Sequence, residues 1–430
     1  MKRKTRSRKP GIRMIQIPDC KHFTGYKPCV PGSTCLDECV DPQPCGTSIL
    51  IVNLEAMGNV LVTTSLLPAI KRKYPRSTIS WITLKNAFRL LDHNPFVDRV
   101  YVWEPESWLK LQSLQFDVVM NFDKAIASAA LIMSLNATTK LGYGLNNRSV
   151  IIPLNREAEY NYRLGLDDNL KFRLNQKPNT QLLAEAVGLK YERDEYVLKL
   201  SIEETRFCDA YRQRIEFSGH STFSHASISN SSEPVRGPDN IGGDEIASRR
   251  RRDRRSPMIV GFNTGCSLLF PNKKMTIDQH VILIDELSKR DGLRILLLGG
   301  PEDAERNAEI VRRVGDKVVG TPTMEGIRRG ICYENLCDVI ITGDSFGMHV
   351  AIALKKYVIV WFGVSCPQEI DLYDRGVKLI PEGLSCSPCW KRECPYQLEC
   401  IQMIDLDRII KEVDLYRDNI SALGAGEQRP

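Results

Sequence analysis

Short runs of apolar residues alternate with amphipathic segments along most of the chain. Residues 48–53 form the first apolar run, which is typical of a buried strand. In residues 59–74 the apolar side chains recur at helical spacing, and Pro75 ends the predicted helix. Shorter elements follow, with strands expected at 78–83, 99–103 and 116–120 and a helix at 87–91. This order of elements predicts parallel βαβ units.

The same alternation returns in the second half of the chain. Strands are expected at 258–262, 294–298, 338–342 and 357–362, and helices at 277–289, 304–314, 324–331 and directly after His349. The two halves together predict two doubly wound α/β domains. Strand ends from both domains would line the cleft between them, which makes this cleft the expected substrate site.

Two segments lack this pattern and mark the domain boundaries. Residues 1–46 are rich in Pro, Gly and Cys, and residues 218–257 are rich in Ser, Gly, Asp and Arg with few large apolar side chains. Such composition is typical of linkers and disordered segments. The predicted organisation is an N-terminal segment (1–46), a first domain (47–205), a partly disordered linker or insertion (206–256), a second domain (257–405) and a C-terminal helix and tail (406–430).

A polar turn joins the predicted strand 338–342 to the helix behind it. The turn places a carboxylate, a hydroxyl and an imidazole (Asp344, Ser345 and His349) at the carboxyl edge of a sheet, beside the free N–H groups of a helix N-terminus. Open α/β sheets bind ligands at this edge, and a helix N-terminus favours phosphate. The alternative is that Asp344 and Ser345 only cap the helix, as both residue types often do.

The net charge of +6 comes from two short tracts. Residues 1–13 hold seven basic and no acidic residues, and residues 249–255 hold six Arg and one Asp, so the rest of the chain carries a net charge of about −6. Nothing near the second tract offers the aromatic stacking or groove-sized helix of nucleic-acid recognition, and no nucleic-acid partner is expected. Contact with an anionic membrane surface and a solvated loop are the two remaining interpretations.

The 14 cysteines cluster toward the two ends of the chain. Five lie within residues 20–45, in spacings that match no known site. Four follow the last predicted strand: Cys386, Cys389, Cys394 and Cys400. We see no secretory signal and no apolar run of the ~20 residues that a membrane helix needs, so a cytoplasmic protein is expected. There, clustered cysteines indicate metal binding more than disulfides, and the second cluster fits one zinc or iron ion; four reduced thiols without an ion are the alternative.

Several separated motifs follow one another in a distinctive order. They are LEAMGN at 54–59, HNP at 93–95, PNKK at 271–274, LGGPE at 298–302, DSFGMH at 344–349, FG at 362–363 and the four-cysteine segment 386–400. In this order and spacing the chain resembles glycosyltransferase family 9, the ADP-heptose:lipopolysaccharide heptosyltransferases, over roughly residues 47–405.

The resemblance implies a GT-B fold, in which the first of two Rossmann-like domains holds the acceptor and the second a nucleotide sugar. It implies inverting, metal-independent transfer of a sugar, most simply heptose, from an ADP-sugar to a cell-surface glycan such as the lipopolysaccharide core, without a catalytic cofactor. Lys273 matches the family's phosphate-binding Lys. By resemblance or by their place at strand ends, the other donor-site residues are Asn263, Thr264, Gly265, Glu302, Asp344, Ser345 and His349.

Two positions depart from the family pattern. Asn59 stands where relatives commonly have the Asp proposed as general base, and an amide cannot take a proton near neutral pH. Either Glu55 or Asp123 then acts as the base, or the enzyme is slow, or the chain binds a nucleotide sugar without catalysing transfer. Phe346 stands where the family usually has Gly, which leaves the sugar open.

Three functions are therefore compared. The first is a glycosyltransferase peripheral to the membrane that extends a surface glycan, which we favour because the donor-site residues are present. The second is a protein glycosyltransferase, because related autotransporter heptosyltransferases carry a four-cysteine finger that holds iron. The third is a non-catalytic nucleotide-sugar-binding protein, suggested by Asn59.

Overall fold

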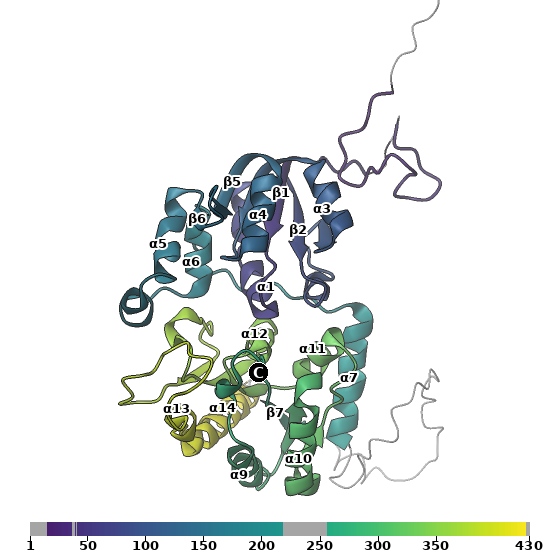
Figure 1. Cartoon of the computed structure of the whole chain (residues 1–430). Helices are drawn as coiled ribbons and strands as arrows, with labels where there is room; N and C mark the ends of the chain where they lie inside the picture. The colour runs from purple at the N-terminus through teal and green to yellow at the C-terminus, as the bar shows by residue number, and fades with distance from the viewer. Residues whose placement is uncertain (1–14, 37–38, 40, 218–255, 427–430) are drawn as a thin grey trace, which may run out of the picture.

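The computed structural model describes residues 15–36, 39, 41–217 and 256–426. They form two α/β domains stacked on each other, and an N-terminal segment extends away from the first domain (Figure 1). The two predicted basic tracts, residues 1–13 and 249–255, and most of the predicted linker lie outside the described residues. Within the described part, no helix is both long enough and apolar enough to cross a membrane.

A six-stranded sheet forms the centre of the first domain. Its strands are β1 (Thr47–Val52), β2 (Ser77–Thr83), β3 (Arg99–Val102), β4 (Gln115–Asn121), β5 (Asn136–Leu145) and β6 (Ile151–Pro153). They lie in the order β3-β2-β1-β4-β5-β6, and only the β5–β6 pair is antiparallel. Successive residues of β1 belong to two different apolar clusters, Ile49 and Ile51 to one and Leu50 and Val52 to the other. Both faces of the sheet are therefore covered, as in a doubly wound domain.

Helices and short helical turns provide this cover. They are α1 (Met57–Thr64), α2 (Leu67–Lys73), α3 (Pro105–Gln112), α4 (Ile126–Ser134), α5 (Glu159–Leu164) and α6 (Asn179–Ala186), with turns η1 (Phe88–Leu91), η2 (Arg156–Ala158) and η3 (Leu170–Leu174). The single helix predicted at 59–74 was wrong, because α1 and α2 are separated at Ser65 and Leu66. Pro68 explains the break: it lacks an N–H group for a continuous helix but fits the first turn of a new one.

The second domain repeats the strand order of the first. Its strands are β7 (Met258–Asn263), β8 (Leu293–Leu298), β9 (Val319–Gly320), β10 (Val339–Gly343), β11 (Tyr357–Trp361) and β12 (Gly376–Leu379). The order β12-β11-β10-β7-β8-β9 is parallel throughout. In both sheets the order reverses between the first and fourth strands, which creates a switch point where ligands bind in Rossmann-like folds.

The helices of the second domain include one that precedes it in sequence. They are α7 (Ile202–Phe217), α9 (Ile277–Leu287), α10 (Ala304–Val314), α11 (Ile327–Asn335), α12 (Phe346–Ala353), α13 (Glu399–Gln402) and α14 (Leu406–Gly426), with turns η5 (Pro271–Lys273), η6 (Pro301–Asp303), η7 (Gly315–Lys317) and η8 (Pro367–Glu369). The helix predicted at 324–331 therefore begins and ends later, as α11.

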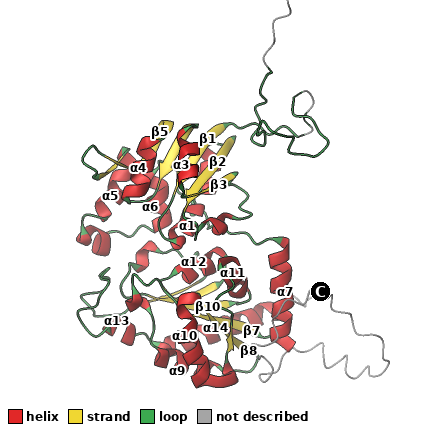
Figure 2. Ribbon diagram, turned by 45° about the vertical axis from the view of Figure 1, so that its right-hand side comes forward, coloured by secondary structure: helices red, strands yellow, loops and turns green. Residues whose placement is uncertain are grey.

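Helix α7 lies along the second domain, although residues 206–217 were predicted as linker (Figures 1 and 2). Arg212 anchors it, donating to the carbonyl of Leu336 (2.9 Å) and pairing with Asp338 (3.0 Å). Tyr211 adds an edge-on contact to Tyr333 of α11, with ring centres 5.4 Å apart. The chain thus crosses between the domains before α7 begins.

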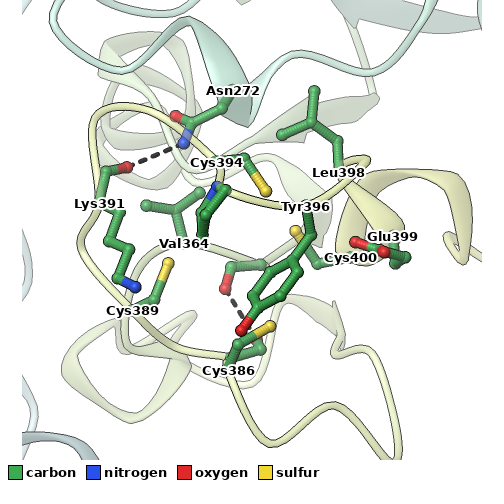
Figure 3. A pocket seen from close by; sticks show the side chains of 13 residues that line it. Asn272, Val364, Cys386, Cys389, Lys391, Cys394, Tyr396, Leu398, Glu399 and Cys400 are labelled. Carbon is green, nitrogen blue, oxygen red and sulfur yellow. Dashed lines mark hydrogen bonds between the residues drawn. The ribbon is translucent and has the colours of Figure 1, made fainter.

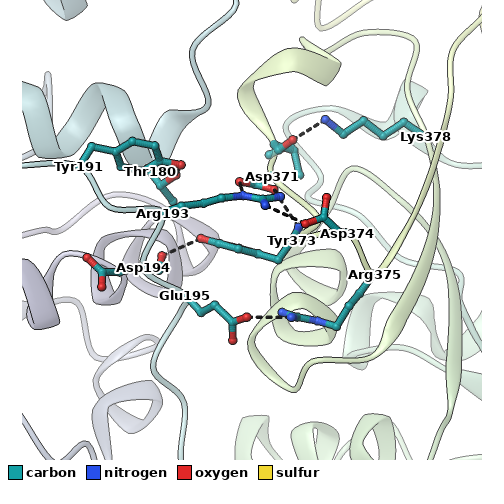
Figure 4. Close-up of polar contacts among 11 residues, drawn as sticks. Thr180, Tyr191, Arg193, Asp194, Glu195, Asp371, Tyr373, Asp374, Arg375 and Lys378 are labelled. Atoms are coloured by element: carbon teal, nitrogen blue, oxygen red, sulfur yellow. Dashed lines mark hydrogen bonds and ion pairs between the residues drawn. The ribbon is translucent and has the colours of Figure 1, made fainter.

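The segment between α6 and α7, residues 187–201, is the crossing segment. It joins the two domains through polar contacts (Figure 4). Arg193 pairs with Asp371 and Asp374 of the second domain, each at 2.7 Å. Beside it, the Tyr373 hydroxyl donates to the carbonyl of Asp194 (2.9 Å). The side chain of Arg193 is nevertheless 45% exposed, so solvent screens its ion pairs. They therefore fix the path of the chain but add little to the free energy of unfolding.

The N-terminal segment contacts only the outer end of the first domain among the contacts described. Lys21 pairs with Asp98 (2.8 Å), and the Thr78 hydroxyl donates to the carbonyl of Cys45 (2.7 Å). This end lies far from the C-terminal cysteine segment next to α13 (Figure 1). The described N-terminal cysteines are therefore not placed to supply ligands to that segment.

Candidate functional site

Two loops meet at the switch point of the second sheet. Asn263 ends β7, and its amide donates to Thr342 Oγ1 (3.0 Å) and to Ser345 Oγ (2.8 Å). Ser345 is the N-cap residue of α12, yet its hydroxyl makes no capping hydrogen bond. The interpretation of Ser345 as only a helix cap is therefore not supported. The first-turn N–H groups of α12 consequently lack a side-chain cap, as in an anion site.

Lys273 reaches the same point from η5. Its ammonium group lies 2.6 Å from Asp344 Oδ2, and each of the two side chains is only 13% exposed. The carbonyl of Lys273 accepts a hydrogen bond from Trp361 Nε1 (2.9 Å), which fixes the loop against β11. Burial opposes ionisation of Asp344, but the positive charge of Lys273 and the hydrogen bond from its ammonium group hold the pKa of Asp344 below the usual range. Lys273 is thus a sheltered cation for which an anionic ligand can compete.

His349 lies one helical turn into α12, where the two domains touch. A Cβ atom on residue 58 would lie 2.7 Å from His349 Cδ2, so only Gly58 permits this approach. On its other side the imidazole stacks on Tyr196, whose hydroxyl is 3.4 Å from His349 Nδ1. Burial lowers the pKa of His349 to about 4, so the ring is neutral near pH 7. A neutral imidazole can donate one hydrogen bond to a ligand but adds no positive charge.

Trp390 is a site residue that the sequence analysis missed. The Lys273 ammonium lies 5.0 Å from the centre of its ring, and the ammonium of Lys171, from the first domain, lies 4.5 Å from it. The residue has a φ of 51°, which is rare for a bulky side chain and persists only where the surroundings enforce it. The sequence shows a Trp directly after a C-x-x-C motif, but no sequence pattern predicts that its ring lies against two lysines.

The other predicted donor-site residues have different surroundings. The Thr264 hydroxyl is buried and donates to Asn307 Oδ1 (2.6 Å), so it holds the loop together. Gly265 follows in the same loop. Glu302 is exposed in η6, after β8, and its carboxylate has no hydrogen bond or ion pair within the described residues. A contact between Glu302 and a nucleotide therefore stays a prediction.

The first domain contributes the opposite wall, at its own switch point between β1 and β4. Asp123 follows β4, and its Oδ1 accepts from Asn53 Nδ2 (2.7 Å). Its Oδ2 accepts from the N–H groups of Leu54 and Glu55. Burial raises the pKa of Asp123 to about 7, although these hydrogen bonds favour its charged form. With both oxygens engaged and only 4% of the residue exposed, Asp123 organises the loop and is poorly placed to meet a substrate.

Glu55 and Asn59 are both exposed on this wall. Asn59 belongs to the first turn of α1, directly after Gly58 and close to His349. An amide can donate and accept hydrogen bonds but cannot take a proton near neutral pH, and a contact between Asn59 and an acceptor hydroxyl stays a prediction. Glu55 is exposed, which is the one observation that favours it as a base. Within the described chain no hydrogen bond orients its carboxylate.

The four C-terminal cysteines line one pocket, together with Tyr396, Lys391 and Asn272 (Figure 3). Burial, followed by the charges of the other three cysteines, raises the pKa of Cys400 to about 11. Thiols are suitable ligands for zinc or iron. Across the described residues, however, no three His, Cys, Asp or Glu side chains are positioned as a coordination set. The ligand type fits a metal, and the side-chain positions do not.

Comparisons with known proteins agree with this architecture. The model of glycosyltransferase family 9 (heptosyltransferase) matches residues 106–399, more than half of the chain. Among curated proteins, the lipopolysaccharide core heptosyltransferase OpsX of Haemophilus influenzae is 26% identical over 182 residues, which is 40% of this chain and 48% of that protein. The lipooligosaccharide heptosyltransferase 2 of Campylobacter jejuni is 29% identical over 79 residues, 18% of this chain and 25% of that protein. The chain thus spans less than half the length of these relatives.

Two solved structures share the fold over most of their length. The family 9 glycosyltransferase from Veillonella parvula has a TM-score of 0.60 at 15% identity, covering 86% of this chain and 96% of that chain. The ADP-heptose lipopolysaccharide heptosyltransferase II of E. coli has a TM-score of 0.59 at 17% identity, covering 86% and 98%. These matches confirm the predicted GT-B arrangement of two Rossmann-like domains.

The packing of the donor loop can be tested at Gly347. A Cβ atom there would lie 2.2 Å from Asn263 Nδ2, so Gly347→Ala must displace the amide that bonds Ser345. We expect a loss of about 1–3 kcal/mol in the free energy of unfolding, measured with urea. Gly330→Ala is the control, because the space at this helical position is open and Ala should stabilise by roughly 0.5–1 kcal/mol. Equal effects of the two substitutions would contradict the crowding at Gly347.

Proposed function

Because the chain belongs to glycosyltransferase family 9, we propose that it transfers a sugar from a nucleotide diphosphate sugar to a glycan. The donor proposed is an ADP-sugar carrying heptose, and the acceptor is a cell-surface glycan such as the lipopolysaccharide core. The similarity to two heptosyltransferases that act on lipopolysaccharide or lipooligosaccharide supports this choice.

The sheltered pair of Lys273 and Asp344 at the switch point carries the proposal. A diphosphate brings two or more negative charges to this point, and Lys273 can leave Asp344 to bind them. The uncapped N–H groups behind Ser345 add partial positive charge on the same side. Asp344 is then free to accept hydrogen bonds from sugar hydroxyls.

In the proposed reaction an acceptor hydroxyl attacks the anomeric carbon from the face opposite the diphosphate, so the configuration inverts. Negative charge develops on the departing diphosphate, where Lys273 and the N–H groups of α12 stabilise it. Asn59 orients the acceptor across the cleft. Since these groups supply the positive charge that a metal ion supplies in other transferases, we propose a metal-independent reaction.

Phe346 leaves the choice of sugar open. Its side chain is half-buried against the apolar cluster that joins the domains. The substitution of Phe for the usual Gly therefore adds apolar packing to α12. The proposal of heptose rests on the similarity to the two curated heptosyltransferases and not on Phe346.

A second function, binding of a nucleotide sugar without transfer, is favoured by one observation. The exposed residue at position 59 is an amide, and Asp123 is held in the loop by three donors. General base assistance contributes about 10²–10⁴-fold to such reactions, so its loss slows turnover without removing the donor site.

A transfer assay tests these functions together. The full chain is incubated with ADP-heptose and either a heptose-free lipopolysaccharide core or a polypeptide acceptor, and ADP release is measured. We expect release with the glycan. Release only with the polypeptide would support protein glycosylation, and binding without release would support the second function. If saturating ADP at ~100 times its dissociation constant fails to stabilise the chain by about 2.7 kcal/mol, the nucleotide site itself is wrong.

Removal of the cation at the switch point should weaken nucleotide binding. Lys273→Met is expected to lower the affinity for ADP by tenfold or more, because a charge-assisted hydrogen bond contributes about 1.5–3 kcal/mol. Isothermal titration calorimetry measures the dissociation constant. The control is Lys289→Met, which removes a lysine that is 65% exposed and pairs with Glu286 near the C-terminal end of α9. An unchanged affinity in Lys273→Met would remove this residue from the donor site.

We also propose that Cys386, Cys389, Cys394 and Cys400 hold one structural zinc or iron ion. Their gathering around one pocket supports this, because a bound cation would offset the mutual repulsion of four thiolates. Binding requires the side chains to turn toward a common centre. When bound, the ion would brace the loop that carries Trp390; it takes no part in the transfer.

Metal analysis of the purified chain checks this proposal. We expect about one zinc or iron ion per chain, held by four thiolates, and loss of the ion in Cys389→Ser. Cys29→Ser, in the exposed N-terminal segment, should keep it. A wild-type chain that contains no metal and takes up neither zinc nor iron would contradict the proposal.

For the cellular location, we propose contact with an anionic membrane surface, where a lipopolysaccharide acceptor would be found. The charge of residues 1–13 and 249–255 supports it, since each basic residue near such a surface contributes roughly 1 kcal/mol.

A further inference from the structure

A carboxylate that the sequence analysis did not select lies where the two domains meet. Glu369 ends the turn η8, in the loop that follows β11. Its side chain is 18% exposed, and its nearest cation is Lys171 of the first domain, 4.0 Å away. Over the whole described part of the chain, its carboxylate accepts no hydrogen bond. Because its oxygens are not fully buried and accept no hydrogen bond from the described residues, a ligand can use them as acceptors.

The position of Glu369 is set by both domains. Gln368 donates to the carbonyl of Lys171 (3.2 Å), which holds η8 against η3. From behind, the Lys378 ammonium donates to the carbonyls of Pro367 (2.8 Å) and Ile370. The backbone on either side of Glu369 is thus held in place, while within the described residues the carboxylate has only the 4.0 Å ion pair with Lys171.

Charged groups from three parts of the cleft surround this carboxylate. Burial raises the pKa of Glu369, Asp344 raises it further, and nearby lysines oppose both effects. The titratable groups that face it are Lys171, Lys124, Lys273, Asp344 and the Cys366 thiol. Glu369 therefore shares one electrostatic environment with the Lys273–Asp344 pair, where the donor diphosphate is proposed to bind.

The alternative bases are less suitable. Asn59 has no proton affinity near neutral pH. Both oxygens of Asp123 accept hydrogen bonds from its own domain. Glu55 is exposed, and within the described residues no hydrogen bond orients its carboxylate.

We propose that Glu369 is the general base of the transfer reaction, an inference that rests on the function proposed above. Its carboxylate takes the proton of the acceptor hydroxyl while the hydroxyl oxygen bonds to the anomeric carbon. The bond from that carbon to the phosphate oxygen breaks, and its electron pair leaves with the diphosphate, next to Lys273. The second domain then supplies the base that Asn59 cannot provide.

The test uses the full chain with ADP-heptose and the glycan acceptor. Glu369→Gln keeps the shape of the side chain but cannot take a proton, so kcat should fall by about 10²-fold or more. The affinity for ADP should change by less than about threefold, since the diphosphate is held elsewhere. In the wild type, kcat should fall as the pH drops below the pKa of Glu369, and this acidic limb should be absent in Glu369→Gln.

Lys171→Met distinguishes a base from a simple ion-pair partner. It removes the nearest cation but keeps the carboxylate, so the pKa of Glu369 should rise and the acidic limb should move to higher pH. At the pH optimum kcat should stay within about tenfold of the wild type. If Lys171→Met loses as much activity as Glu369→Gln, the ion pair between the domains, and not a general base, explains both losses. That result would overturn the proposal.

Two further results would overturn it. One is a Glu369→Gln variant that keeps more than about a tenth of the wild-type kcat. The other is an acidic limb that disappears in Glu55→Gln and persists in Glu369→Gln. Absence of transfer by the wild type would refute the proposed function and this inference together, whereas an active wild type with an active Glu369→Gln variant refutes the inference alone.

Discussion

The contact between α1 and α12 sets the geometry on which the candidate site depends. Each helix begins at the switch point of its own sheet, and Gly58 lets the imidazole of His349 approach the backbone of α1. Tyr196, from the crossing segment, closes the other side of that ring. Apolar residues of both helices, including Val60 and Met348, belong to one buried cluster. Because interiors are densely packed, this contact fixes how far apart the two walls of the cleft stand.

The two domains contribute different kinds of groups to the candidate site. The second domain holds Lys273, the N-terminus of α12 and the carboxylates Asp344 and Glu369, and Lys171 of the first domain pairs with Glu369. The first domain holds an ordered loop, built around Asp123, that displays Asn59 and Glu55. Such a division fits a reaction in which one partner carries a diphosphate and the other offers only a hydroxyl group.

Much of the fold could be predicted because buried parallel strands appear in sequence as apolar runs. The predicted runs around β1, β7 and β10 all became central strands, and the polar residues at their ends met as expected. Asn263, Lys273, Asp344 and Ser345 were chosen from separate motifs and lie together. The edge strands β9 and β12 were missed because they have only 2 and 4 residues and carry little periodicity.

The site residues that were not predicted are positioned by contacts with distant parts of the chain. Trp390 and Glu369 stand in irregular loops, and each meets Lys171, some 200 positions earlier. The environment of the Glu369 carboxylate is visible only once its neighbours are known. Asp123 shows the opposite. Its position at a strand end suggested a general base, but its carboxylate is engaged in holding the loop after β1.

The placement of α7 has a consequence for how this protein can change over evolution. Its last residue, Phe217, and the first residue of β7, Met258, both belong to the second domain. The intervening stretch therefore joins two points of one rigid unit and does not tether one unit to another. A gain or loss of residues between these two points would therefore change a connection within the second domain and leave the connection between the two domains unchanged.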